Sequence, residues 1–287
     1  MKNMTIETEK SSQELKIKPK KENIFFKFFR FSRKFGILVS EGATIKDKLA
    51  IILYTPKTFS HLISYDYNSH FLWDVTLKNK DGIFFCGKNN IAVFTGSTLD
   101  EIKLRDYFKL DEGVFVDIGS NIGKYAVKIG RKLSGGKGRV IALEPEPYNF
   151  EILKKNIKLN NLDNVLPLQL ACYSENKKLT FYVEKSGSGS HSIYPTNSAS
   201  KTIIIDALKL DDILKKNKIE RVDLIKIDVE GAEVNVFQGA MNTIKKYHPQ
   251  IIFECFSEDN LNKIEKILDK FNYHIKELPQ GKNYLAY

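Results

Sequence analysis

The stretch that most constrains the fold of this chain runs from Gly113 to Tyr125 and reads Gly-Val-Phe-Val-Asp-Ile-Gly-Ser-Asn-Ile-Gly-Lys-Tyr. Its first half is a short apolar run of β-prone residues, and its second half is a turn that contains Gly119 and Gly123. Residues 124–133 follow with apolar side chains at helical spacing. Glycines let a ligand approach the backbone closely, and free N–H groups at a helix start attract electron-rich groups. The sequence therefore predicts a strand, a glycine turn and a helix that together bind a nucleotide-like ligand.

A second acid follows at the expected distance. Residues 139–145 read as the next strand, which ends in Glu144 about 20 residues beyond the glycine turn, where Rossmann-type sheets contact a ribose. The turn lacks the spacing of dinucleotide sites, and Asp117 precedes its first glycine, where a carboxylate suits a cationic ligand. Together these features resemble the cofactor site of class I S-adenosyl-L-methionine (SAM) methyltransferases. The alternative is a glycine turn in an unrelated α/β sheet.

A second signature lies at residues 223–233, Asp-Leu-Ile-Lys-Ile-Asp-Val-Glu-Gly-Ala-Glu, which reads as a strand ending in an acidic turn. With the glycine turn, Glu144-Pro145 and residues 249–254, it resembles the FkbM family of SAM-dependent methyltransferases, over roughly residues 80 to 280. The resemblance implies O-methylation of hydroxyls on sugars or related metabolites, so a small-molecule or glycan acceptor is expected. The predicted cofactor contacts are Asp117, Gly119, Ser120, Asn121, Gly123, Tyr125, Glu144, Pro145, Ala171 and Cys172.

Three carboxylates are the candidate catalytic acids. SAM carries an activated methyl group, so an enzyme must align the acceptor oxygen and remove its proton. Asp228, Glu230 and Glu254 follow predicted strands and are expected to act directly or through a divalent ion, for which oxygen ligands favour Mg²⁺. Asp228 is the preferred base. The alternative is that Glu230 and Glu233 bond backbone N–H groups at the start of the next helix.

A Gly/Ser loop interrupts the βα alternation. Residues 178–184 and 201–206 read as extended segments, and residues 187–192 between them form a candidate substrate lid. Its titratable side chain, His191, is a further candidate catalytic residue. A lone loop histidine without a role is the alternative. Residues 165–173 are expected to be one strand, with Ala171 and Cys172 beside the adenine ring.

The other predicted elements complete a Rossmann-like class I methyltransferase fold: α/β, mostly parallel, with an antiparallel C-terminal edge strand and an N-terminal helical extension. The helices are expected at residues 98–110, 145–160, 207–216, 232–247 and 260–271. The remaining strands are expected at a hairpin around Asp81-Gly82, and at residues 91–94, 250–256, 273–278 and 283–287.

The net charge of +10 is concentrated near the N-terminus, because residues 16–34 hold eight basic residues and one acid. Residues 1–22 are expected to be a disordered tail, 23–70 a basic helical extension and 71–287 the methyltransferase domain. Within the extension, the pattern of residues 24–38 predicts an amphipathic helix. This helix is expected to bind an anionic membrane surface or, as the alternative, to pack on the catalytic domain or on a second subunit. His61 and His70 lack a ligand pattern and are expected to be structural.

Three scattered cysteines indicate neither a zinc site nor a disulfide framework, and no signal peptide or apolar run of about 18 residues is found. The protein is expected to be cytoplasmic, and peripheral attachment to the membrane is left open. The catalytic part shows no interleaving of basic and aromatic residues, which argues against a nucleic-acid partner. An RNA methyltransferase that uses the basic segment and a non-enzymatic scaffold are the alternatives.

Overall fold

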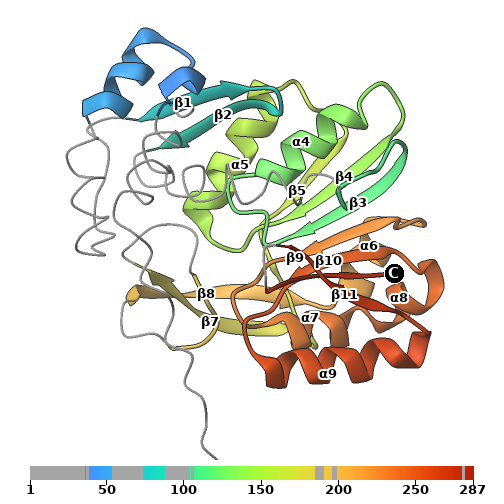
Figure 1. Ribbon diagram of the computed structural model, residues 1–287. Coiled ribbons are helices and arrows are strands. Elements are labelled where there is room, and N and C mark those ends of the chain that lie inside the picture. Colours follow the sequence, from blue (N-terminus) through green and yellow to red (C-terminus); the bar gives the residue numbers. More distant parts are fainter. Residues whose placement is uncertain are drawn as a thin grey trace, which may run out of the picture.

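The computed structural model describes residues 36, 39–53, 74–87, 104, 107–184, 191–195, 199–279 and 282–287. Its centre is a seven-stranded sheet in the order β11-β12-β10-β9-β3-β4-β5 (Figure 1). The strands are β3 (Gly113–Ile118), β4 (Gly138–Leu143), β5 (Val165–Leu168), β9 (Leu224–Ile227), β10 (Gln250–Glu254), β11 (Ile275–Glu277) and β12 (Asn283–Ala286).

The sheet is parallel except at β12, which runs antiparallel to both β10 and β11. The antiparallel strand therefore lies second from the edge rather than at the edge itself, because the chain closes with β12 between β10 and β11. The predicted pair of C-terminal strands is confirmed, but its antiparallel member is the second strand from the edge of the sheet.

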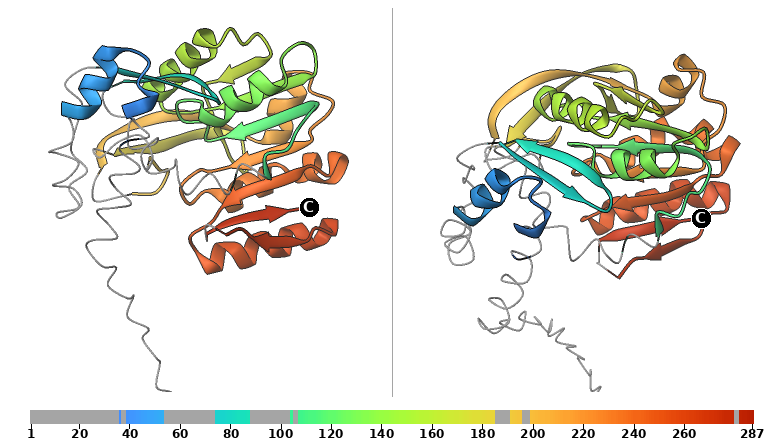
Figure 2. Two further views of the ribbon diagram at one scale, coloured as in Figure 1. Left: turned by 45° about the horizontal axis from the view of Figure 1, so that its top comes forward. Right: turned by 90° about the horizontal axis from the view of Figure 1, so that it is seen from above.

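Helices cover both faces of the sheet (Figures 1 and 2). One buried cluster joins β3 and β4 to α4 (Lys124–Lys132) and α5 (Pro147–Leu159). A second buried cluster lies on the opposite face of the sheet. Because successive side chains of a strand point to opposite faces, Phe115 joins the first cluster, while Val116 and Ile118 join the second. The helices of this second face are α6 (Leu210–Lys216), α7 (Glu233–Gly239), α8 (Met241–Tyr247) and α9 (Glu258–Leu268), which continues into the short 3₁₀ helix η2 (Asp269–Phe271).

The predicted hairpin is confirmed as β1 (Val75–Asn79) and β2 (Gly82–Gly87), which form a separate two-stranded sheet. Asn156 of α5 and Asn160, which directly follows α5, take the place of a neighbouring strand along β2. Asn156 exchanges hydrogen bonds with the backbone of Phe85, and Asn160 does the same with the backbone of Ile83. These side chains hold the hairpin against the catalytic domain.

The segment expected to be one strand at residues 165–173 is divided between two sheets. β5 ends at Leu168, where the N–H of Leu170 bonds back to the Leu168 carbonyl, and β6 (Ala171–Cys172) joins a second sheet in the order β6-β8-β7. That sheet contains β7 (Lys177–Glu184) and β8 (Ala199–Leu208). Because Ala207 and Leu208 pair with β6, the helix expected from residue 207 begins only at Leu210.

The single helix expected at residues 232–247 is two helices, α7 and α8, which meet at Ala240. The Asp211 carboxylate of α6 accepts hydrogen bonds from the backbone N–H groups of Asn242 and Thr243, and so caps α8 from outside. The helix expected at residues 98–110 lies largely outside the described residues. Its last three residues, 108–110, are not helical, because Phe108 stacks on Tyr125 with 4.4 Å between ring centroids.

The predicted tail at 1–22, His61, His70 and the strand at 91–94 lie outside the described residues, as does the helix at 24–38 apart from Gly36. A helical segment at residues 45–53 confirms a helix within the N-terminal extension. Within the described parts of the chain, no helix has the length and apolar character needed to cross a bilayer.

Candidate active site

A cavity opens at the carboxyl ends of β3, β4 and β9, which is where open α/β sheets bind ligands. One side is formed by the glycine turn after β3 and by Glu144. The opposite side is formed by the acidic turn after β9 and by the second sheet. The lining includes Gly119, Ser120, Asn121, Tyr125, Glu144, Pro145, Ala171, Cys172, Tyr173, Phe181, His191, Ile193, Lys226, Asp228 and Glu230.

The glycine turn adopts a backbone that other residues rarely adopt. Gly119 has φ +79°, and a Cβ there would overlap the carbonyl oxygen of Asp228. Gly123 has φ +89° and lies behind the cavity lining, at the start of α4. The turn therefore lies tightly against the backbone at the end of β9, and the N–H groups of residues 119–123 all donate to oxygens within the protein.

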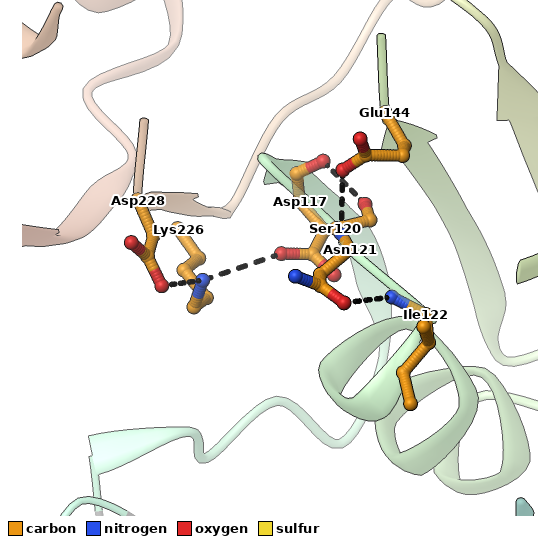
Figure 3. Close-up of polar contacts among 7 residues, drawn as sticks. All are labelled: Asp117, Ser120, Asn121, Ile122, Glu144, Lys226 and Asp228. Carbon is orange, nitrogen blue, oxygen red and sulfur yellow. Dashed lines mark hydrogen bonds and ion pairs between the residues drawn. The ribbon is translucent and has the colours of Figure 1, made fainter. Parts of the chain in front are cut away.

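Glu144 is fixed at the end of β4 by two backbone donors. It accepts a hydrogen bond from the N–H of Asn121 at 2.8 Å (Figure 3) and another from the N–H of Glu146 at 2.9 Å. Burial raises the pKa of Glu144 to about 8, although these hydrogen bonds oppose the shift. Each carboxylate oxygen keeps a second lone pair, so Glu144 can also accept hydrogen bonds from ligand hydroxyls.

Asp117 is fully buried behind the turn, and neither of its carboxylate oxygens has a hydrogen-bond partner among the described residues. Burial raises its pKa to about 6, while the Lys226 ammonium, 4.0 Å from Oδ1, opposes that rise. A buried carboxylate without donors is destabilising unless a ligand supplies the missing charge or hydrogen bonds. This arrangement fits the positively charged ligand that the sequence predicts.

Lys226 is a site residue that the sequence did not reveal, because it lies within the apolar strand β9. Its Nζ donates to Asp228 Oδ2 at 3.0 Å (Figure 3). The same Nζ lies 5.1 Å from the centroid of the Tyr125 ring. Burial alone would lower the pKa of Lys226, but Asp228 and Asp117 raise it above its usual value, so the side chain is charged. The only signal in the sequence was one basic residue in an otherwise apolar strand.

The structure brings the three predicted catalytic acids together. Asp228, Glu230 and Glu254 each offer a carboxylate oxygen within 4.8 Å of the other two. Burial, followed by the proximity of Asp228, raises the pKa values of both Glu230 and Glu254 to about 8. Asp228 and Glu230 line the cavity, whereas Glu254 lies behind them.

Glu230 and Glu233, for which hydrogen bonds to backbone N–H groups at the helix start were the alternative, have different roles in the structure. Glu233 accepts a hydrogen bond from the N–H of Gly231 at 2.9 Å, so its carboxylate caps the turn before α7. Glu230, with φ +52°, instead lines the cavity, and its carbonyl accepts a hydrogen bond from Ser192. The capping role is therefore confirmed for Glu233.

His191 lies in the cavity wall beside Phe181, at the end of the predicted lid, of which residues 187–190 lie outside the described residues. Its Nδ1 accepts a hydrogen bond from the N–H of Glu184 at 3.0 Å, and burial lowers its pKa. Since Nδ1 accepts, the neutral ring carries its proton on Nε2. His191 is thus arranged to donate a hydrogen bond into the cavity rather than to remove a proton.

A doubly wound sheet with a glycine turn after its central strand, an acid at the end of the next strand and an antiparallel strand before its edge defines a Rossmann-like fold of the class I methyltransferase type. The chain belongs to the FkbM methyltransferase family: the family model described as the methyltransferase FkbM domain matches residues 117–275, more than half of the chain.

Several curated relatives are similar to the chain, of which three are described. Methyltransferase 1 of Beauveria bassiana is 29% identical over 45% of this chain and 59% of its own length. Hexuronic acid methyltransferase AglP of Haloferax volcanii is 24% identical over 61% of this chain and 70% of its own length. The 2-O-methyltransferase NoeI of Sinorhizobium fredii is 27% identical over 52% of this chain and 65% of its own length. The chain thus spans less than two thirds of the first and third of these relatives.

Among solved structures, methyltransferase FkbM from Methylobacillus flagellatus is similar with a TM-score of 0.46 and 16% identity. The match covers 91% of this chain and 60% of that chain.

Proposed function

We propose that the protein is a SAM-dependent O-methyltransferase that acts on a hydroxyl of a sugar, glycoconjugate or related metabolite. The observation that carries the proposal is the buried carboxylate of Asp117, which accepts no hydrogen bond from the described residues, behind a glycine turn whose Asn121 N–H fixes Glu144. When bound, SAM supplies a methyl group already activated by a positively charged sulfur. Asp117 provides the negative charge for its cationic methionine portion, and Glu144 accepts hydrogen bonds from its ribose hydroxyls.

The acceptor is proposed to enter from the side of the acidic turn. Asp228 and Glu230 lie on that wall, and both can accept a hydrogen bond from an acceptor hydroxyl. Tyr173 and Phe181 line the same cavity, and a sugar ring can stack on an aromatic ring of this kind. Relatives named for hexuronic acid methylation and for 2-O-methylation support an oxygen acceptor on a sugar.

The proton of the acceptor hydroxyl is proposed to pass to Asp228 or Glu230. Asp228, the base preferred from the sequence, is held in place by Lys226 at 3.0 Å. Burial raises the pKa of Glu230 to about 8, and general bases work best with pKa values near the working pH. Both residues therefore belong in the test of catalysis.

The carboxylate cluster does not provide a good Mg²⁺ site, because a protein cation already lies in it. The Lys226 ammonium occupies Asp228 Oδ2 and repels a second cation there. We accordingly give Mg²⁺ no part in the proposed reaction, and Lys226 serves as the positive charge beside the acids.

The proposal is tested by isothermal titration calorimetry with SAM and with S-adenosylhomocysteine. We expect the wild type to bind both, and the Asp117→Asn and Glu144→Gln variants to lose roughly tenfold or more in affinity, which corresponds to about 1.4 kcal/mol each. Glu220→Gln changes an exposed side chain before the amino end of β9, whereas the cavity lies at the carboxyl end of that strand; it is the matched control and should bind like the wild type. A folded wild type that binds neither compound would contradict the proposal and favour a non-enzymatic scaffold.

A further inference from the structure

The helical segment at residues 45–53 carries apolar side chains on its outer face as well as its inner face. On the inner face, Ala50 and Ile51 belong to the same buried cluster as Leu77 of β1. On the outer face, Ile45, Leu49 and Leu53 are 79%, 49% and 56% exposed. Residues four positions apart lie above one another on a helix, so these three side chains form one outward apolar stripe.

The stripe is held in place by polar contacts beneath it. Asp47, which is buried, accepts hydrogen bonds from the N–H of Thr44 at 2.9 Å and from the N–H of Thr76 at 2.9 Å. The N–H of Ala43 also donates to the Thr76 carbonyl at 2.9 Å. These bonds fix the segment to β1, so its outer face has a defined orientation.

The exposed apolar side chains are concentrated here rather than scattered. Ten large apolar side chains are exposed among the described residues, and four of them lie within residues 45–53. Single exposed apolar residues are normal, whereas a gathering of them marks an interaction surface. Figures 1 and 2 show the segment, in blue, at the outer side of the hairpin and away from α9.

The charges around the stripe identify the kind of partner. Lys46 and Lys48 are exposed on the same segment, and residues 16–34, a short way upstream in the sequence, hold eight basic residues and one acid. Apolar side chains bordered by lysines favour the boundary of an anionic bilayer, where the apolar groups enter the acyl region and the lysines meet the headgroups. Nine helical residues span only about 13.5 Å, so the segment must lie along such a surface.

We propose that the stripe formed by Ile45, Leu49 and Leu53 docks the protein on an anionic membrane surface. The proposal does not depend on the proposed methyl transfer. It places the contact on residues 45–53, which follow in the sequence after residues 24–38, where an amphipathic basic helix is predicted.

The test is flotation of the full chain with phosphatidylcholine vesicles that contain or lack phosphatidylserine, without SAM. We expect the wild type to float with the anionic vesicles, and the double variant Leu49→Glu/Leu53→Glu to bind them roughly tenfold or more weakly. The control is Ile204→Glu, which changes a side chain on β8 that is 64% exposed and should leave binding unchanged. Circular dichroism of each variant checks that the fold is retained.

Equal flotation of the wild type and the double variant would overturn the proposal. A second contradicting result is possible from light scattering. If the wild type is a dimer, the double variant is a monomer and both bind vesicles equally, the stripe is a contact between two copies of the chain. Neither result bears on SAM binding, which the calorimetric experiment measures separately.

Discussion

Individual charged residues occupy the buried site before any ligand arrives. Asp117, Lys226 and Asp228 form a row from the glycine turn to the acidic turn, with Lys226 Nζ 4.0 Å from one carboxylate and 3.0 Å from the other. Burial makes each charge costly, so the row is stable only because opposite charges alternate. A positively charged cofactor extends this alternation beyond Asp117.

The affinity for SAM should fall at low pH because Asp117 becomes protonated. Its pKa in the free protein is about 6, and a neutral carboxyl cannot pair with a cationic ligand. Below pH 6 the affinity should therefore decrease, by up to about tenfold per pH unit, and above pH 7 Asp117 should cause no further change. Calorimetry between pH 5 and 8 measures this dependence. Asp117→Asn should remove it, and an unchanged slope in that variant would assign the titration to another group.

Removal of either wall carboxylate should reduce turnover and leave cofactor binding intact. Asp228→Asn and Glu230→Gln each remove an acceptor for the hydroxyl proton, and a general base contributes about 10²- to 10⁴-fold to a rate. We expect a fall in kcat of that order for at least one of the two variants. The dissociation constant for S-adenosylhomocysteine should change less than about threefold in both. Wild-type turnover in both variants would exclude both acids as the base.

Methyl transfer should proceed without a divalent ion. Since the Lys226 ammonium already contacts Asp228, turnover in excess EDTA should equal turnover with added magnesium chloride. The rate of methyl transfer to a hexuronic acid glycan, followed with isotopically labelled SAM, is the measurement. Activity lost in EDTA and restored by Mg²⁺ would show that an ion displaces Lys226.

At the scale of secondary-structure elements, side chains rather than strands join the accessory parts to the central sheet. Asn156 of α5 bonds the backbone of Phe85 in β2 and also donates to the carbonyl of Ile122 in the glycine turn at 2.8 Å. One buried side chain thus connects the hairpin, the helix and the cofactor turn. The hairpin in turn carries the helical segment at residues 45–53.

Asn156→Ala should therefore destabilise the protein and loosen the cofactor turn together. The loss leaves the backbone groups of Phe85 and Ile122 without these partners, at a cost of about 2–4 kcal/mol. Thermal unfolding should show a melting temperature lower by roughly 4–10 °C. Asn242→Ala removes an exposed asparagine side chain on α8 and serves as the control. Equal melting temperatures for the two variants would contradict this role for Asn156.

At the scale of the whole molecule, buried acids make the cofactor-free protein less stable at higher pH. The pKa values of Glu144, Glu230 and Glu254 in the folded protein, each about 8, exceed the usual value of 4.5. Between these two pH values the unfolded chain releases protons that the folded chain keeps, so the free energy of unfolding falls as pH rises. Above pH 8 these groups cause no further loss.

The melting temperature should therefore decrease from pH 5 to pH 8. Over this range the free energy of unfolding should fall by a total on the order of 2–5 kcal/mol, after allowance for the partial exposure of Glu230 and Glu254. Differential scanning calorimetry measures it. Glu144→Gln should make the decrease smaller, because glutamine does not titrate. A melting temperature that rises steadily over this range would contradict the assigned burial of these acids.

The sequence predicted those features that depend on neighbouring residues. The glycine turn after β3 and the acid at the end of β4 are each encoded within a dozen residues, and both are confirmed in place. The convergence of Asp228 with Glu254 also followed from the sequence, because both acids end parallel strands that lie side by side.

Features that depend on distant contacts were missed. Local propensity gave no sign that residues 165–173 divide between two sheets, or that Asp211 caps α8 from another helix. Lys226 was overlooked because its charge is compensated by side chains from two different strand ends. Such contacts exist only after the chain has folded, so pattern and spacing do not reveal them.

The most direct measurement is a crystal structure of the protein with S-adenosylhomocysteine. The account predicts that the ribose hydroxyls lie within hydrogen-bond distance of Glu144, that the amino group lies beside Asp117, and that the sulfur faces Asp228 and Glu230. A ligand bound elsewhere, or bound here with its ribose away from Glu144, would contradict the proposed cofactor site.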